Sequence, residues 1–358
     1  MVDSFVHDVP ASRVVFGAGS LDQVGEELER LGSSRALLIS GGPEAEYADR
    51  IASELGERIH GRFTDVVMHV PVAIAAQAIE ASRGADSLIA LGGGSSTGMA
   101  KAVAKETGLP ILAVPTTYAG SEMTSIWGLT ENNRKVTGRD PKVLPRTVVY
   151  DPELTLTLPV NISAASGMNA LAHLVEGLYA PGVSPLQVLT AQEGVRALAV
   201  ALPKVVARPT DIDARAEALY GAWLAGWTLG TTGMGVHHKI CHVLGGAYDL
   251  PHGPMHSAVL AYATAFNEAS APQAMTALIA ALREAGLEAP TAAAGIWDLA
   301  GLIGAPTCLA DVGFDPRHID EAASLVVEGR PINPRPVELE GVRELLAAAS
   351  RGARPEAS

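Results

Sequence analysis

Apolar and polar positions follow two different periods along the chain. In the first 150 residues, short β-branched runs predict strands at 13–16, 36–40, 64–70, 87–91, 111–114 and 147–150. Helical spacing predicts helices between them at 21–31, 44–55, 72–82 and 97–106. Because alternating strands and helices are typical of a parallel sheet with crossover helices, this part is expected to form an α/β domain.

After residue 151 the pattern changes to long helical stretches rich in Ala and Leu. Helices are expected at 164–179, 185–201, 212–228 and 272–285, among others. The turn-like Leu158-Pro159 separates the two patterns. We therefore expect an α/β domain over residues 1–158, an all-α domain over residues 159–352 and a flexible tail over residues 353–358.

Composition narrows the possible partners. The 358 residues contain 26 Lys and Arg against 39 Asp and Glu, a net charge of −13, which argues against nucleic acid as a partner. A charge-free window over residues 218–236 is long enough to span a membrane, but its five glycines favour a buried helix and loop, so no membrane association is expected. Two distant cysteines, Cys241 and Cys308, and the lack of an amino-terminal signal sequence favour the cytoplasm.

A glycine loop follows the predicted strand at 87–91. Gly92, Gly93 and Gly94 have no Cβ atom, so a ligand can approach the backbone, and Ser95 and Ser96 offer hydroxyls at the start of the next helix. A second polar loop follows the strand at 111–114 and contains Thr116, Thr117 and Ser121. Either loop alone could be an ordinary capped turn. Together, at the carboxyl ends of successive strands, they predict a nucleotide site.

Histidines gather in the second half. Asn169 and His173 are four residues apart, as are His238 and His242, and five of the ten histidines fall within residues 237–256. Imidazoles suit metal binding or proton transfer near neutral pH. Asn169 is uncharged where a metal site normally has a carboxylate, which counts against a metal. Three imidazoles can still hold zinc, so a zinc or iron site is the alternative.

These motifs resemble the iron-containing alcohol dehydrogenase-like superfamily, and more closely its maleylacetate reductase branch. The resemblance covers nearly the whole chain and is carried by FGAGS at 16–20, GGGS at 92–95, PTTYAGSE at 115–122, YDPELTLTLP at 150–159 and HHKICHVLGG at 237–246. It implies an amino-terminal α/β nucleotide-binding domain and a carboxy-terminal helical domain, the fold shared with dehydroquinate synthase. It also implies NADH or NADPH as the cofactor and a homodimer.

The resemblance further implies roles for the histidines. The superfamily's metal ligands, one Asp and three His, match Asn169, His173, His238 and His252, and the branch has asparagine at the first of these positions and works without metal. His242 matches a histidine near the nicotinamide and is a candidate proton relay. The four histidines are therefore the expected catalytic set, and the metal positions are expected to be vestigial.

The implied reaction is hydride transfer from NADH or NADPH to the conjugated C=C bond of maleylacetate, which gives 3-oxoadipate in the degradation of aromatic compounds. A small dicarboxylate keto acid needs cations, and five basic residues lie within residues 134–146. A solvated basic loop is the plainer interpretation of that stretch. The residues expected to contact the substrate are Asn169, Tyr118, Arg139, Lys142 and Lys239.

Three other functions remain open. A metal-dependent alcohol dehydrogenase or aldehyde reductase is the first, a non-redox enzyme of the dehydroquinate synthase type is the second, and a non-catalytic binding protein is the third. The cofactor preference is also open, because the strand at 36–40 runs into Ser40-Gly41-Gly42 with no acidic residue to exclude a 2′-phosphate.

Overall fold

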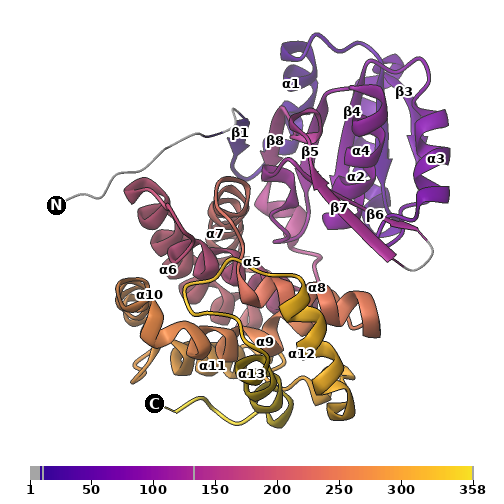
Figure 1. Ribbon diagram of the computed structural model, residues 1–358. Helices are drawn as coiled ribbons and strands as arrows, with labels where there is room; N and C mark the ends of the chain where they lie inside the picture. Colours follow the sequence, from indigo (N-terminus) through magenta and orange to yellow (C-terminus); the bar gives the residue numbers. More distant parts are fainter. Residues whose placement is uncertain (1–8, 10–11, 132–133, 357–358) are drawn as a thin grey trace. The chain divides into compact units, whose positions relative to one another are not determined.

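A computed structural model describes residue 9, residues 12–131 and residues 134–356. The chain divides at the Leu158–Pro159 bond into two compact units, an α/β unit over residues 9–158 and a helical unit over residues 159–356 (Figure 1). The expected fold class, α/β followed by all-α, is confirmed.

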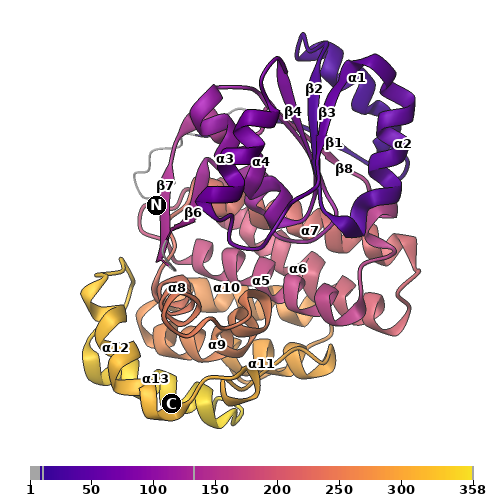
Figure 2. The same cartoon turned by 90° about the vertical axis from the view of Figure 1, so that its right-hand side faces the viewer.

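The α/β unit is built on a six-stranded parallel sheet with the order β1-β8-β5-β4-β2-β3. In Figure 2 the helices α1 and α2 lie on one face of this sheet, and α3 and α4 lie on the other. The strands are β1 (Arg13–Phe16), β2 (Ala36–Ser40), β3 (Ile59–Phe63), β4 (Ser87–Gly92), β5 (Ile111–Pro115) and β8 (Thr147–Tyr150). The helices are α1 (Val24–Arg30), α2 (Ala45–Leu55), α3 (Val72–Ala81) and α4 (Gly94–Thr107).

The central strands of the sheet coincide with apolar runs in the sequence. Every residue of β2, β4 and β5 is buried, as expected for strands covered by helices on both faces. Gly92 at the end of β4 pairs with Pro115 at the end of β5. This register places the glycine loop next to the second polar loop.

The strand predicted at 64–70 is wrong. The third strand lies earlier, at β3, on the edge of the sheet, where the sequence IHGRF carries no β-branched run beyond its first residue. Val67 and Met68 are 41% and 65% exposed, and His69 and Val70 have positive φ angles of 65° and 46°. That left-handed backbone cannot continue a strand.

An antiparallel ribbon in the α/β unit was not predicted. It consists of β6 (Ile126–Glu131) and β7 (Arg134–Arg139), and the Trp127 side chain lies across Gly138, where a Cβ atom would be 2.6 Å from the indole ring. The ribbon carries part of the basic stretch. The side chains of β6 and of residues 136–139 in β7 are half-buried or exposed, and these strands lack the apolar runs by which strands were recognised.

The helical unit packs closely through small residues. A Cβ atom at Gly167 would overlap with Leu202 of a neighbouring helix. In the same way, one at Gly177 would overlap with Thr228 and one at Gly194 with Leu174. These glycines therefore allow α5, α6 and α7 to approach one another. The helices are α5 (Val160–Leu178), α6 (Pro185–Ala207), α7 (Ile212–Thr231), α8 (Val236–Tyr248), α9 (His252–Asn267), α10 (Pro272–Glu284), α11 (Ala292–Leu302), α12 (Ile319–Glu328) and α13 (Leu339–Arg351).

The charge-free window at 218–236 is divided between two helices. Helix α7 ends at Thr231 and α8 begins at Val236, with a short connection between them. Among the residues that the structure describes, no helix combines the length and the apolar character needed to cross a bilayer.

Candidate active site

Three helices of the helical unit bring a set of polar side chains together. Helix α5 passes almost wholly through the core and packs against α9, which in turn packs against α8. The residues concerned are Asn169, His173 and Glu176 on α5, His237, His238 and His242 on α8, and His252 and His256 on α9.

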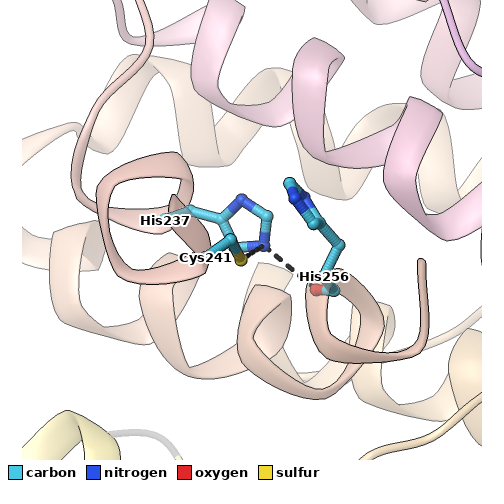
Figure 3. A group of neighbouring side chains, drawn as sticks. All are labelled: His237, Cys241 and His256. Atoms are coloured by element: carbon cyan, nitrogen blue, oxygen red, sulfur yellow. Dashed lines mark hydrogen bonds between the residues drawn. The ribbon is translucent and has the colours of Figure 1, made fainter. Parts of the chain in front are cut away.

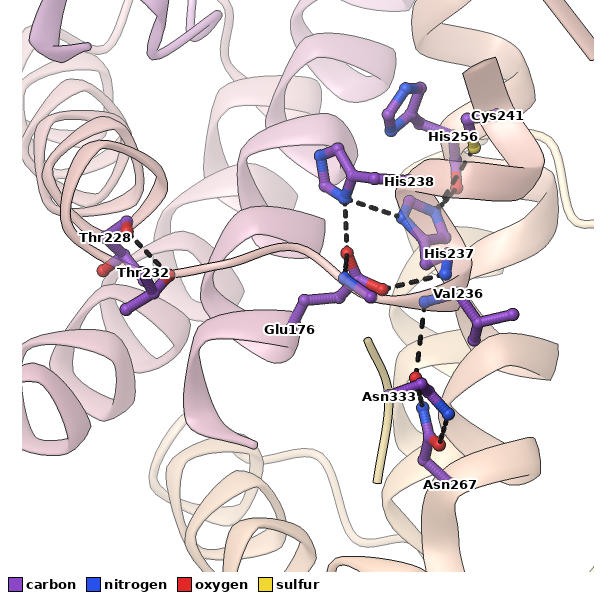
Figure 4. A network of polar contacts seen from close by, with 11 residues as sticks. Glu176, Thr228, Thr232, Val236, His237, His238, Cys241, His256, Asn267 and Asn333 are labelled. Atoms are coloured by element: carbon purple, nitrogen blue, oxygen red, sulfur yellow. Dashed lines mark hydrogen bonds and ion pairs between the residues drawn. The ribbon is translucent and has the colours of Figure 1, made fainter. Parts of the chain in front are cut away.

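Glu176 joins α5 to the start of α8 (Figure 4). Its Oε1 accepts the backbone N–H of His237 at 2.8 Å, and its Oε2 accepts the backbone N–H of Gly235 at 3.0 Å and Nδ1–H of His238 at 2.6 Å. A carboxylate at a helix N-terminus also interacts favourably with the helix dipole. Sequence analysis missed Glu176, although it lies three residues after His173 and therefore on the same face of the helix.

The contact with Glu176 determines which nitrogen of His238 remains available. Because Nδ1 donates to the carboxylate, Nε2 carries the lone pair, and it has no hydrogen-bond partner among the described residues. Burial, followed by the neighbouring His242 and His252, lowers the pKa of His238 well below its usual value. His238 is thus a neutral imidazole with a fixed tautomer.

His173 and Asn169 are also buried with atoms unpaired. The ring of His173 lies 5.0 Å from that of His238, and burial lowers its pKa well below the usual value. Neither Nδ1 of His173 nor Oδ1 of Asn169 has a partner within the described part of the chain. Buried polar atoms are normally paired, so these unpaired atoms are candidate ligand-binding groups.

His237 is a structural neighbour of this site. Its Nε2–H donates to the carbonyl oxygen of His256 at 3.0 Å, and Cys241 Sγ lies 3.8 Å from the same nitrogen (Figure 3). Burial lowers the pKa of His237 to about 4. Since Nε2 already donates a hydrogen bond, His237 connects α8 to α9 and is poorly placed to act as a ligand.

His256 was not among the predicted site residues, yet it lies deep in the cluster. It is 1% exposed, and both ring nitrogens lack a hydrogen-bond partner within the described part of the chain. Its ring lies 5.1 Å from that of His238 and 4.3 Å from that of His252. The four-residue spacing of His252 and His256 on one helix was the signal available in the sequence.

The other predicted residues of the helical unit lie nearer the surface. His242 and His252 are exposed, and the ring of His242 is 6.3 Å from that of His238. Lys239 is half-buried and lies against Gly329, where a side chain would overlap with it. Asn333, in the loop that follows, accepts the backbone N–H of Val236 at 3.3 Å and exchanges hydrogen bonds with Asn267 (Figure 4).

The predicted nucleotide residues lie at the carboxyl ends of β4 and β5 in the α/β unit. Gly92 has a φ of 135°, and a Cβ atom there would lie 2.5 Å from Ser96 Oγ. A Cβ atom at Gly93 would lie 3.0 Å from Thr117. Helix α4 begins at Gly94, so Ser95 and Ser96 lie in its first turn with its free N–H groups.

A buried lysine supports the loop that contains Ser121. Lys101 on α4 is fully buried, and its ammonium group donates to Ser121 O and Oγ, Thr124 O and Oγ1, and Ile126 O at 2.6–3.2 Å. Burial lowers its pKa to about 7. This lysine was not singled out in the sequence.

The predicted substrate contacts of the α/β unit differ in exposure. Tyr118 is fully buried, whereas Arg139 at the end of β7 and Lys142 are exposed. The backbone N–H of Lys142 donates to Asp140 at 2.9 Å. The substrate roles of these three residues stay predictions.

Comparison with known proteins decides the family. The model of the iron-containing alcohol dehydrogenase family matches residues 11–152, and the model of the family's C-terminal part matches residues 163–350. A maleylacetate reductase of Burkholderia cepacia is 49% identical over 99% of this chain and 100% of its own length. The chain belongs to the maleylacetate reductase branch of the iron-containing alcohol dehydrogenase family.

Solved structures of this family share the fold over their full length. The crystal structure of maleylacetate reductase from Rhizobium sp. strain MTP-10005 is 46% identical, with a TM-score of 0.94 over 99% of this chain and 100% of that one. A protein from Ralstonia eutropha JMP134, provisionally described as an alcohol dehydrogenase, is 49% identical with a TM-score of 0.96 over 99% and 100%.

Membership of an iron-containing family overturns the expectation of no metal, which rested on Asn169. Candidate donor atoms for a metal ion are present in the helical unit. His173 Nδ1, His238 Nε2 and Asn169 Oδ1 are buried and unpaired within the described residues, and burial keeps both imidazoles neutral. Neutral imidazoles suit zinc and iron, and Glu176 orients His238 through Nδ1 in the way that carboxylates commonly orient metal-binding histidines.

Proposed function

We propose that this protein reduces the conjugated C=C bond of maleylacetate with NADH or NADPH and forms 3-oxoadipate. The observation that carries the proposal is full-length identity of 48–49% to maleylacetate reductases from Burkholderia cepacia, Pseudomonas sp. strain P51 and Delftia acidovorans. The chain covers at least 99% of the length of each relative.

The cofactor is expected at the loops after β4 and β5. The N–H groups at the start of α4 favour a pyrophosphate. The missing Cβ atoms of Gly92 and Gly93 leave room for the side chains of Ser96 and Thr117 to pack against the glycine loop. The hydroxyls of Thr116 and Thr117 lie on the adjacent loop for further hydrogen bonds. The bound nicotinamide supplies a hydride for the alkene carbon remote from the ketone.

Hydride addition to an alkene conjugated with a ketone develops enolate charge, which hydrogen-bond donors stabilise. The enolate carbon then takes a proton, for which exposed His242 is the proposed donor. His238 lies four residues earlier on the same face of α8. His173, His238, Asn169 and, by family match, His252 would hold a metal ion. A bound divalent metal supplies Lewis-acid stabilisation of negative charge on oxygen.

The substrate's two carboxylates are expected to meet basic groups. Arg139 and Lys142 are exposed in the α/β unit, and Lys239 has no ion-pair partner among the described residues of the helical unit. An arginine can hold a carboxylate through two parallel hydrogen bonds. We therefore assign Arg139 to substrate capture and expect its loss to raise KM more than it lowers kcat.

A cofactor-oxidation assay with maleylacetate tests the proposal. One NADH consumed per 3-oxoadipate formed, with the product identified by mass spectrometry, is the expected result. Metal content is measured on the same protein, purified without chelator. The description of the Ralstonia protein favours alcohol dehydrogenase as the second candidate. Oxidation of alcohols with NAD⁺, and no reduction of maleylacetate, would replace the proposal with that candidate.

We further infer a homodimer in the cytoplasm. The dimer is a family-level expectation, and light scattering during gel filtration tests it by giving twice the chain mass of 37.0 kDa. Cys241 and Cys308 are both free thiols, which fits a reducing compartment.

A further inference from the structure

An acidic side chain lies against the glycine loop. Glu44 is the last residue of a short 3-10 helix (Gly42–Glu44) that follows β2. A Cβ atom at Gly92 would lie 3.3 Å from Glu44 Cδ, and one at Gly41 would lie 3.1 Å from Glu44 Oε2. Glu44 Oε1 accepts the hydroxyl of Thr116 at 3.1 Å. The carboxylate therefore lies beside the carboxyl ends of β2, β4 and β5.

This carboxylate has hydrogen-bonding capacity to spare. The Thr116 hydroxyl is its one recorded donor, and no arginine or lysine pairs with it within the described residues. Two carboxylate oxygens can accept about four hydrogen bonds. Glu44 is half-buried, so it remains accessible to a ligand. An underused acceptor at the edge of a nucleotide site fits a ligand rich in hydroxyl groups.

Sheet order determines which part of a dinucleotide meets Glu44. Strand β4, which leads into the glycine loop, lies between β5 and β2, and Leu91 pairs with Ser40 at the end of β2. In the classical dinucleotide-binding fold the pyrophosphate binds at the glycine loop, and an acidic residue after the neighbouring strand accepts a hydrogen bond from the 2′-hydroxyl of the adenosine ribose. Glu44 occupies the equivalent place here, four residues beyond the end of its strand.

We propose that Glu44 accepts a hydrogen bond from the 2′-hydroxyl of the adenosine ribose and selects NADH over NADPH. The 2′-phosphate of NADPH would bring two negative charges toward the carboxylate and remove the hydroxyl donor. The inference rests on the proposed function, because it requires a nicotinamide dinucleotide at the glycine loop. Sequence analysis considered only Ser40-Gly41-Gly42 at this strand end and left the cofactor preference open.

Direct titration of NADH and NADPH, followed by protein or cofactor fluorescence, tests the assignment without turnover. The informative variant is Glu44→Gln, which keeps the length of the side chain and an acceptor oxygen for Thr116. The control is Glu46→Gln, an exposed glutamate two residues along the chain, in the first turn of α2. Thermal unfolding of all three proteins shows whether each variant is folded.

The wild-type protein is expected to bind NADH at least about tenfold more tightly than NADPH, and Glu44→Gln to remove most of that difference, chiefly by tighter binding of NADPH. The Glu46→Gln variant should keep the wild-type ratio. An unchanged ratio in a folded Glu44→Gln protein, or no preference in the wild type, would overturn the inference while leaving reduction of maleylacetate intact. If the wild type binds neither nucleotide, the proposed function fails instead.

Discussion

The direction of a single hydrogen bond controls the chemistry of His238. Its Nδ1–H donates to a carboxylate that also accepts two backbone N–H groups, so the imidazole cannot rotate or exchange tautomers without breaking that arrangement. The free Nε2 faces the cluster as a lone-pair donor. Burial raises the pKa of Glu176, while its three donors favour the charged form. We consider it a carboxylate paired with a neutral imidazole.

Glu176→Gln is expected to destabilise the protein by about 1–3 kcal/mol, because one amide hydrogen must face a buried donor. The same change should weaken metal binding by about 10–100-fold, since His238 loses its orienting carboxylate. Urea unfolding and metal titration measure the two effects. The exposed Glu340→Gln on α13 is the matched control and should change stability by less than about 0.5 kcal/mol. Equal stability of the two variants would refute the role of Glu176.

At the scale of elements, side chains hold loops at the ends of strands and helices. Helix α4 supports the segment from Ser121 to Ile126 through the ammonium group of Lys101. In the helical unit, the pairing of Asn267 with Asn333 connects the loop after α12 to α9 and to the start of α8. Each contact positions a loop beside a predicted ligand site, so local stability and binding are coupled there.

Lys101→Met should cost about 3 kcal/mol or more, because it leaves the carbonyl groups of the 121–126 segment buried without a donor. Lys105→Met, one turn further along α4, is the control, because Lys105 pairs with Glu106 near the surface and should contribute less than about 1 kcal/mol. Chemical denaturation of both variants gives the comparison. Equal losses would show that the Lys101 contacts add nothing to stability.

Across the whole molecule, sequence reasoning predicted the elements correctly where burial is continuous, whereas the site roles that it assigned from spacing stay predictions. The fully buried β2, β4 and β5 were predicted because helices cover both faces, and His173, His238 and His242 were selected by helical spacing. The edge strand β3 and the β6–β7 ribbon lack an apolar run. Glu44 was missed because a carboxylate has no periodicity to reveal it, and Thr116, its partner, lies 72 residues away.

Four buried histidines of the helical unit make the stability of the whole protein depend on pH under acidic conditions. Burial lowers the pKa of His237 to about 4 and takes the pKa values of three others well below the usual range: His173, His238 and His256. In the unfolded chain each histidine protonates near pH 6.5. Between these limits the unfolded chain binds more protons than the folded one, so stability is lost as the pH falls.

The free energy of unfolding of chelator-treated protein should therefore decrease between about pH 6.5 and about pH 4, by up to about 1.4 kcal/mol per pH unit for each histidine. Glu176 acts in the opposite sense, because burial raises its pKa and the folded state then binds the extra proton. The Glu176→Gln variant removes that opposing contribution, so its stability should fall more steeply with acid than that of the wild type. Urea unfolding at several pH values gives both slopes. If the free energy of unfolding of the wild type stays constant or increases as the pH falls through this range, the buried imidazoles are already protonated in the folded protein.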